Sequence, residues 1–119
     1  MMEEYEELIA KLKGTIDYAI DTYIRISGQD LLAIETRKFF DTEGIKIIRF
    51  LKYAVEHADD YRELMLSSIK SAIESGKHAM ERDLSKKENL YLLIEWASQI
   101  LPSLKVAFER VIGPPLSLT

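Results

Sequence analysis

Hydrophobic residues recur at helical intervals between residues 45 and 82. At about 100° per residue, these positions fall on one stripe of an amphipathic helix. The members of the stripe are Ile47, Ile48, Leu51, Ala54, Val55, Ala58, Met65, Leu66, Ile69, Ala72, Ile73 and Met80. Only Arg62 and Gly76 interrupt it. Because such a stripe has to be buried against other helices, the pattern predicts an all-α fold organised around this stretch.

The continuity of residues 45–82 is open to two interpretations. Asp60 and Glu63 match a capping box, which favours a new helix start and a hairpin near residues 59–60. Against this, the apolar phase continues across Asp59 and Asp60, and no Gly, Pro or Asn is present there to form a tight turn. We therefore expect one continuous helix of about 38 residues. The hairpin is the alternative.

The stretch before residue 45 predicts two shorter helices. Residues 3–26 carry an a/d seam that ends at Ser27-Gly28, and Asp30 is placed to cap a helix over residues 31–40. The apolar phase of residues 31–40 does not match the long stripe, which indicates a break at Asp41 to Gly44. Phe39 and Phe40 are expected to anchor that corner in the core.

The last helix is expected over residues 86–112. Ser85 and Glu88 match a second capping box, and Pro102 predicts a kink after which the helix resumes. Gly113 to Pro115 is expected to end the helix and leave a loose tail. The chain is thus predicted to be one antiparallel bundle of about four helices, forming a single domain over residues 1–119.

Composition and charge narrow the classes of function. The formal charge is −4, so binding of nucleic acid would require a local patch. Such a patch is predicted opposite the apolar stripe, at Lys46, Arg49, Lys52 and Tyr53, where cations and a ring could contact phosphates and a base. Arg37 and Lys38 would extend the patch if the corner at Asp41 to Gly44 folds toward it. The alternative is a solvated face paired with acids, such as the glutamates near the N-terminus.

Candidate catalytic and metal chemistry is sparse. The chain has no cysteine, no Gly-rich phosphate loop and no nucleophile elbow. Its two histidines, His57 and His78, lack the Glu-x-x-His pairs of carboxylate-bridged di-iron bundles. We therefore expect no enzyme activity, no metal site and no cofactor.

The start of the last helix is apolar on every side. The residues concerned are Leu90, Tyr91, Leu92, Ile94 and Trp96. One face can seal the bundle, and the other then needs a second chain. We expect self-association or a protein partner here. The alternative is a central helix in a monomer, with Trp96 in the core.

These observations favour a non-enzymatic helical interaction or oligomerisation module, as a homodimer or a small subunit of a larger assembly. The alternative is a subunit of a ribonucleoprotein complex that binds the nucleic-acid backbone. In size and helix content the chain is similar to small all-helical subunits of CRISPR effector complexes, although no motif matches residue by residue. The early glutamates and the lack of a long apolar run predict a cytoplasmic protein without a signal peptide or membrane span. Abundant Glu, Lys and Ile with a single Asn resemble the composition of proteins from hot environments.

Overall fold

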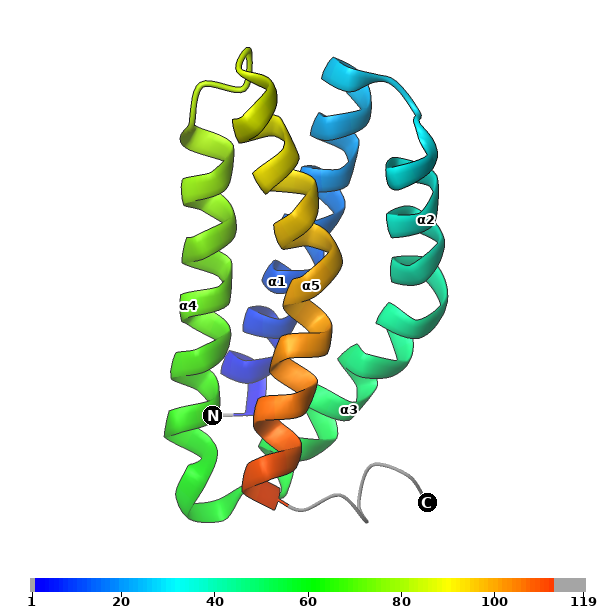
Figure 1. Ribbon diagram of the computed structural model, residues 1–119. Helices are drawn as coiled ribbons and strands as arrows, with labels where there is room; N and C mark the ends of the chain where they lie inside the picture. Colours follow the sequence, from blue (N-terminus) through cyan, green and yellow to red (C-terminus); the bar gives the residue numbers. More distant parts are fainter. Residues whose placement is uncertain (1, 113–119) are drawn as a thin grey trace.

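The computed structural model describes residues 2–112 and is an all-α antiparallel bundle (Figure 1). Its elements are α1 (Met2–Ser27), α2 (Leu31–Phe39), the π-helical turn η1 (Phe40–Gly44), α3 (Ile45–Glu56), the short 3-10 turn η2 (Asp59–Tyr61), α4 (Arg62–Glu81) and α5 (Lys87–Ile112). α2, η1 and α3 follow one another without a gap and form one continuous rod. The chain runs up α1, down this rod, up α4 and down α5 (Figure 1).

The prediction for α1 is confirmed, and the local chemistry explains both of its ends. Its a/d seam is buried from Tyr5 to Tyr23, whereas the last member, Ile26, is exposed. Gly28 adopts a φ of +88°, the left-handed conformation that ends many helices. Asp30 then caps α2 as expected, since its carboxylate accepts a hydrogen bond of 2.9 Å from the amide of Ala33.

The predicted break at Asp41 to Gly44 is wrong. The backbone remains helical there as the π-helical turn η1, and Gly44 has the right-handed φ and ψ of −59° and −40°. A π-turn fits one extra residue into a helix, so it shifts the apolar phase without interrupting the rod. Phe40 is buried at this point, as expected, and Phe39 is half-buried against the core.

The preferred single helix over residues 45–82 is also wrong, and the hairpin alternative is correct. α3 ends at Glu56, and Asp59 adopts a φ of +50°, a conformation that Asp tolerates better than most residues. Arg62 completes the corner: its Nε donates to the carbonyl of Val55 (3.0 Å) and its guanidinium to that of Glu56 (3.1 Å). The last carbonyls of α3, which lack a full set of helical partners, thereby gain side-chain donors.

Neither predicted capping box forms. Tyr61 precedes α4 without a side-chain cap, and Asp60 makes no such bond. Before α5, the amide and hydroxyl of Ser85 both donate to Asp83, at 3.1 and 2.6 Å, so Ser85 does not cap the helix. α5 nevertheless begins within one residue of the predicted start and continues through Pro102. The kink at Pro102 stays a prediction, and the predicted stop at 113–115 lies outside the described residues.

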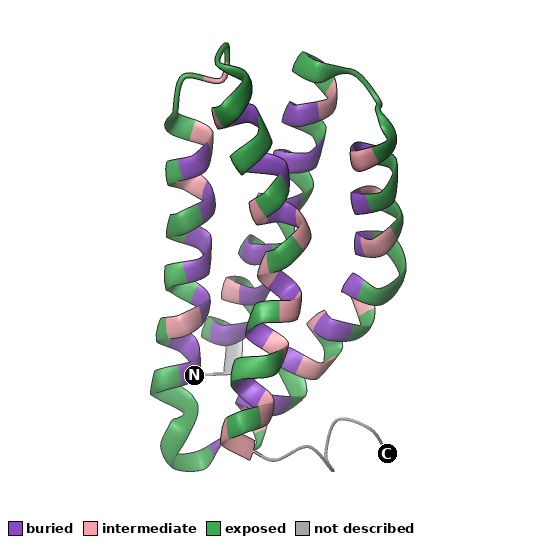
Figure 2. Cartoon of the chain, viewed as in Figure 1, coloured by how far each residue is buried: buried purple, intermediate pink, exposed green. Residues whose placement is uncertain are grey.

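The buried side chains form one cluster along the middle of the bundle (Figure 2). Every member of the predicted stripe is buried or half-buried, because the hairpin turns both of its halves toward α1 and α5. α4 and α5 approach closely at Gly76, where a Cβ would lie 2.5 Å from the ring of Trp96. None of the helices described over residues 2–112 is long and apolar enough to cross a membrane.

Candidate functional site

The predicted basic face lies on the outer side of α3. Lys46, Arg49, Lys52 and Tyr53 are all exposed there. Both lysines are held by acids: the Nζ of Lys46 is 3.3 Å from Glu43, and that of Lys52 is 3.5 Å from Glu6 of α1. The alternative interpretation, pairing with acids that include an N-terminal glutamate, therefore holds for the two lysines. Arg49 has no ion pair with any residue that the structure describes.

Two rings accompany Arg49 on this face. Tyr53 stacks on His57 with ring centroids 4.1 Å apart, and Nδ1 of His57 is 2.9 Å from the carbonyl oxygen of Tyr53. Arg37 does not extend the patch, because its guanidinium donates to Asp17 and Asp21 of α1 at 2.6 and 2.7 Å. The accessible cationic surface is thus smaller than the sequence predicts, and Arg49 is its main unpaired charge.

The apolar set at the start of α5 is divided between the core and the surface. Leu90 and Ile94 are 8% and 0% exposed and pack inside the bundle, so in this structure they cannot contact a second chain. Trp96 is half-buried over Gly76, which corresponds in part to the alternative of a core tryptophan. Tyr91 and Leu92 remain on the surface, 57% and 42% exposed. Of the predicted interface residues, these two are the most accessible.

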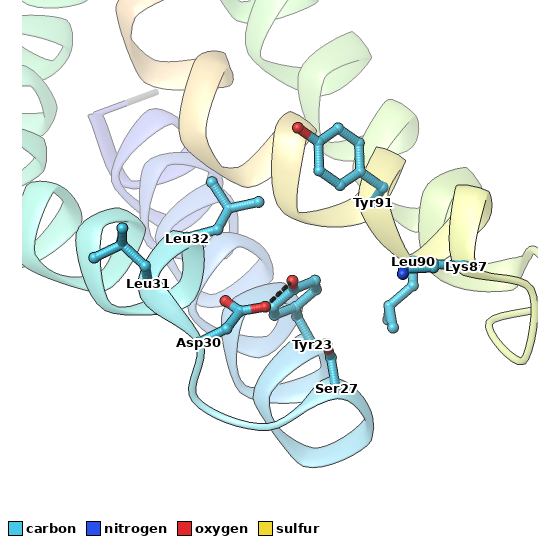
Figure 3. Close-up of a pocket in the computed structure, with 8 residues that line it drawn as sticks. All are labelled: Tyr23, Ser27, Asp30, Leu31, Leu32, Lys87, Leu90 and Tyr91. Atoms are coloured by element: carbon cyan, nitrogen blue, oxygen red, sulfur yellow. Dashed lines mark hydrogen bonds between the residues drawn. The ribbon is translucent and has the colours of Figure 1, made fainter.

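A hollow of about 370 Å³ lies beside Tyr91, where the end of α1 meets the starts of α2 and α5 (Figure 3). It is mostly apolar. Its lining residues are Tyr23, Ser27, Asp30, Leu31, Leu32, Lys87, Leu90 and Tyr91. The hydroxyl of Tyr23 donates to the carboxylate of Asp30 at 2.6 Å (Figure 3). That bond raises the pKa of Tyr23 and, with the amide of Ala33, lowers the pKa of Asp30, so Asp30 stays ionised as the cap of α2.

The apolar surface continues from the hollow along α5. A shallow depression there is lined by Lys87, Glu88, Tyr91 and Leu92, so the two depressions share Lys87 and Tyr91. Leu31 borders the hollow from α2 and is 70% exposed. We call Leu31, Lys87, Tyr91 and Leu92 the Tyr91 surface. Sequence reasoning missed Leu31, although the scatter of apolar residues around the 31–40 helix was a signal that some of them face outward.

Candidate metal ligands do not gather in the described part of the chain. Within residues 2–112, no three side chains of the His, Cys, Asp and Glu types converge as metal ligands would. The Nε2 of His78 lies 3.9 Å from Glu74, four residues earlier on the exposed side of α4. Ser71 and Ser75 line the same depression as His78, but within residues 2–112 no side-chain hydroxyl forms a hydrogen bond with either histidine ring.

Comparison with known proteins yields no relative: no family model matches the chain, and no curated protein or solved structure is significantly similar. The features that bear on function are therefore the basic face of α3 and the Tyr91 surface.

Proposed function

We propose that the chain is a non-enzymatic helical interaction module that binds a protein partner through the Tyr91 surface. The observation that carries the proposal is the exposure of Leu31 and Tyr91 at the hollow and of Leu92 in the adjoining depression, at 70%, 57% and 42%. Single exposed apolar residues are ordinary on soluble proteins, whereas a contiguous group bordered by charges is typical of an interaction site.

The shape and chemistry of this surface support the proposal. The hollow is large enough to receive a side chain, and its apolar walls from Leu32 and Leu90 would be dehydrated by an aliphatic or aromatic group. Tyr91 stands between the hollow and the shallow depression on α5. Tyrosine is enriched among the residues that contribute most to binding energy, because it combines a large apolar area with a hydroxyl group. Lys87 and Glu88 would form the polar rim.

Site-specific photo-crosslinking in the native host tests this proposal. A photoreactive residue replaces Leu92, and the matched control carries it at Tyr18 on α1, which is 60% exposed and lines neither depression. We expect a discrete adduct, identified by mass spectrometry, from position 92 and none from position 18. No adduct at 92, or the same adducts from both positions, would overturn the proposal.

Binding of a nucleic-acid backbone is the second candidate, and the unpaired Arg49 beside the Tyr53–His57 stack favours it. Cations contact phosphates, and exposed rings stack on bases. Its test is a salt titration with single-stranded RNA. Phosphate contacts predict that log K falls with log[salt] at a slope of about −0.7 per contact.

Replacing Arg49 by Glu should weaken RNA binding, whereas Arg82→Glu makes the same charge change in the loop between α4 and α5 and should weaken it less. Absence of binding at low salt would remove this candidate. Equal weakening by both variants would show that Arg49 is not a specific contact.

A further inference from the structure

We infer that the partner of the Tyr91 surface is a second copy of this chain, docked α5 against α5 in antiparallel orientation about a twofold axis at Tyr91. This inference rests on the proposed function and names the occupant of the same surface. The order of charges along α5 and the way in which helices pack support it.

Three exposed residues, Lys87, Tyr91 and Glu95, follow one another at intervals of four on α5. Residues four apart form a ridge on a helix, and alignment of two such ridges is the commonest mode of helix packing in globular proteins. The ridge carries a cation at one end, an aromatic ring in the middle and an anion at the other end. The ridge is therefore complementary in charge to a second copy of itself that runs in the opposite direction.

Lys87 and Glu95 do not form an ion pair with each other. They are eight residues apart, about 12 Å along the helix axis at 1.5 Å per residue, which is too far for an ion pair between them. Neither forms an ion pair with another residue in the described part of the chain. Both charges are thus available to a second molecule.

A twofold axis through Tyr91 pairs these charges twice. Reversal of the ridge places Lys87 beside Glu95 of the second copy, and the same contact recurs on the other side of the axis, as in any isologous interface. The two Tyr91 rings meet at the centre, with Leu92 next to them on the same exposed side of α5. A parallel arrangement would instead set Lys87 against Lys87, a repulsive contact. The charge order therefore selects the antiparallel dimer.

The decisive experiment uses two charge reversals and their mixture. Lys87→Glu makes both ends of the ridge negative, and Glu95→Lys makes both ends positive, so each variant alone faces like charges across the twofold axis. Mixed in equal amounts, the two variants have opposite charges at both contacts. Sedimentation velocity measures the dimer dissociation constant of the wild type, of each variant and of the mixture.

We expect a wild-type dimer in the micromolar range, a dissociation constant raised about tenfold or more in each variant, and recovery of dimers in the mixture. Matched controls make the same charge changes on the continuous rod, with Lys46→Glu in α3 and Glu43→Lys in η1, and should leave the wild-type dimer unchanged. All substituted residues are exposed, and circular dichroism verifies that each variant is folded.

Two results would overturn the inference. A wild-type protein that stays monomeric at several hundred micromolar would exclude the second copy as the occupant. A dimer that neither reversal weakens, or that mixing does not restore, would exclude the antiparallel α5 geometry. Failure of the homodimer can be distinguished from failure of the proposed function. A crosslink from position 92 to a different protein would support the proposed function while refuting the homodimer.

Discussion

Replacing Gly76 by alanine tests how closely α4 and α5 pack. Gly76 is buried on α4 beneath the half-buried ring of Trp96. A Cβ at this position would lie 2.5 Å from Cη2 and Cζ2 of Trp96 and 3.0 Å from Cε2. Ordinary carbon contacts are about 3.5–4.0 Å. The rigid indole ring would therefore have to move outward by about 1–1.5 Å, the difference between 2.5 Å and an ordinary carbon contact.

Two opposing effects determine the magnitude. Overpacking a well-packed site costs about 1–3 kcal/mol. Alanine, however, is favoured over glycine in a helix interior by about 1 kcal/mol. Gly14, exposed within α1, provides the matched control, because a Cβ there meets nothing within 4 Å. Gly14→Ala should raise the free energy of unfolding by about 1 kcal/mol through helix propensity alone. The free energy of unfolding of Gly76→Ala should be lower than that of Gly14→Ala by the steric cost of about 1–3 kcal/mol.

Urea unfolding followed by circular dichroism measures both variants on the same basis. Trp96 is the only tryptophan, so its fluorescence also reports directly on displacement of the ring in Gly76→Ala. Adding Trp96→Leu should remove the steric clash, after which Gly76→Ala should stabilise the protein as Gly14→Ala does. If Gly76→Ala and Gly14→Ala stabilise the wild type equally, the close approach of α4 and α5 at this point is refuted.

Three further predictions concern the α3–α4 corner and the α1–α3 contact. Asp59→Gly should stabilise the fold by about 1 kcal/mol, because glycine adopts positive φ without the penalty of a side chain; an unchanged urea midpoint would contradict the left-handed corner. Arg62→Ala should destabilise by about 1–2 kcal/mol, because it removes two charged hydrogen bonds to the end of α3, and chemical denaturation measures the loss. The hydrogen bond from Tyr5 to Glu56 raises the pKa of Tyr5 to about 12. Its contribution is fully present below the unfolded tyrosine pKa near 10 and is lost as the pH rises through about 12. The stability deficit of Tyr5→Phe should therefore shrink between pH 10 and pH 12, and a deficit independent of pH would contradict this assignment.

The all-α class and the buried stripe were predictable because both follow from local periodicity. The corner at residues 57–61 was predicted only as the alternative, since it contains no Gly, Pro or Asn. Asp59 supplies the left-handed residue, and the cap comes from Arg62, whose side chain reaches back six and seven residues. A bond of that kind depends on the folded path of the chain and leaves no mark in the sequence pattern.

The phase mismatch before residue 45 is real, but its cause is a π-turn and not the predicted break. A helix break and a π-turn change the apolar phase in the same way, and only the backbone hydrogen bonds distinguish them. In the sequence, Gly44 favours a break. In the structure, its lack of a side chain instead permits close packing. A Cβ there would lie 3.2 Å from Phe40 and 3.4 Å from Leu101, so glycine allows the rod to approach α5.

The candidate surfaces were predictable only in part, because one helix does not reveal which neighbours cover it. Leu90 and Ile94 resemble Tyr91 and Leu92 in hydrophobicity, and only the positions of the other helices place the first pair inside. The pairing of Lys52 with a specific glutamate of α1 likewise requires the tertiary arrangement.

The π-turn at Phe40–Gly44 gives the rod from Leu31 to Glu56 two differently oriented halves. One extra residue rotates everything after it by about 100° about the helix axis. Leu31 and Ile34 face solvent from α2, before the π-turn. Lys46 and Arg49 face solvent from α3, after it. A single uninterrupted rod thus presents apolar side chains to solvent along α2 and basic side chains along α3, with no hinge between the two segments.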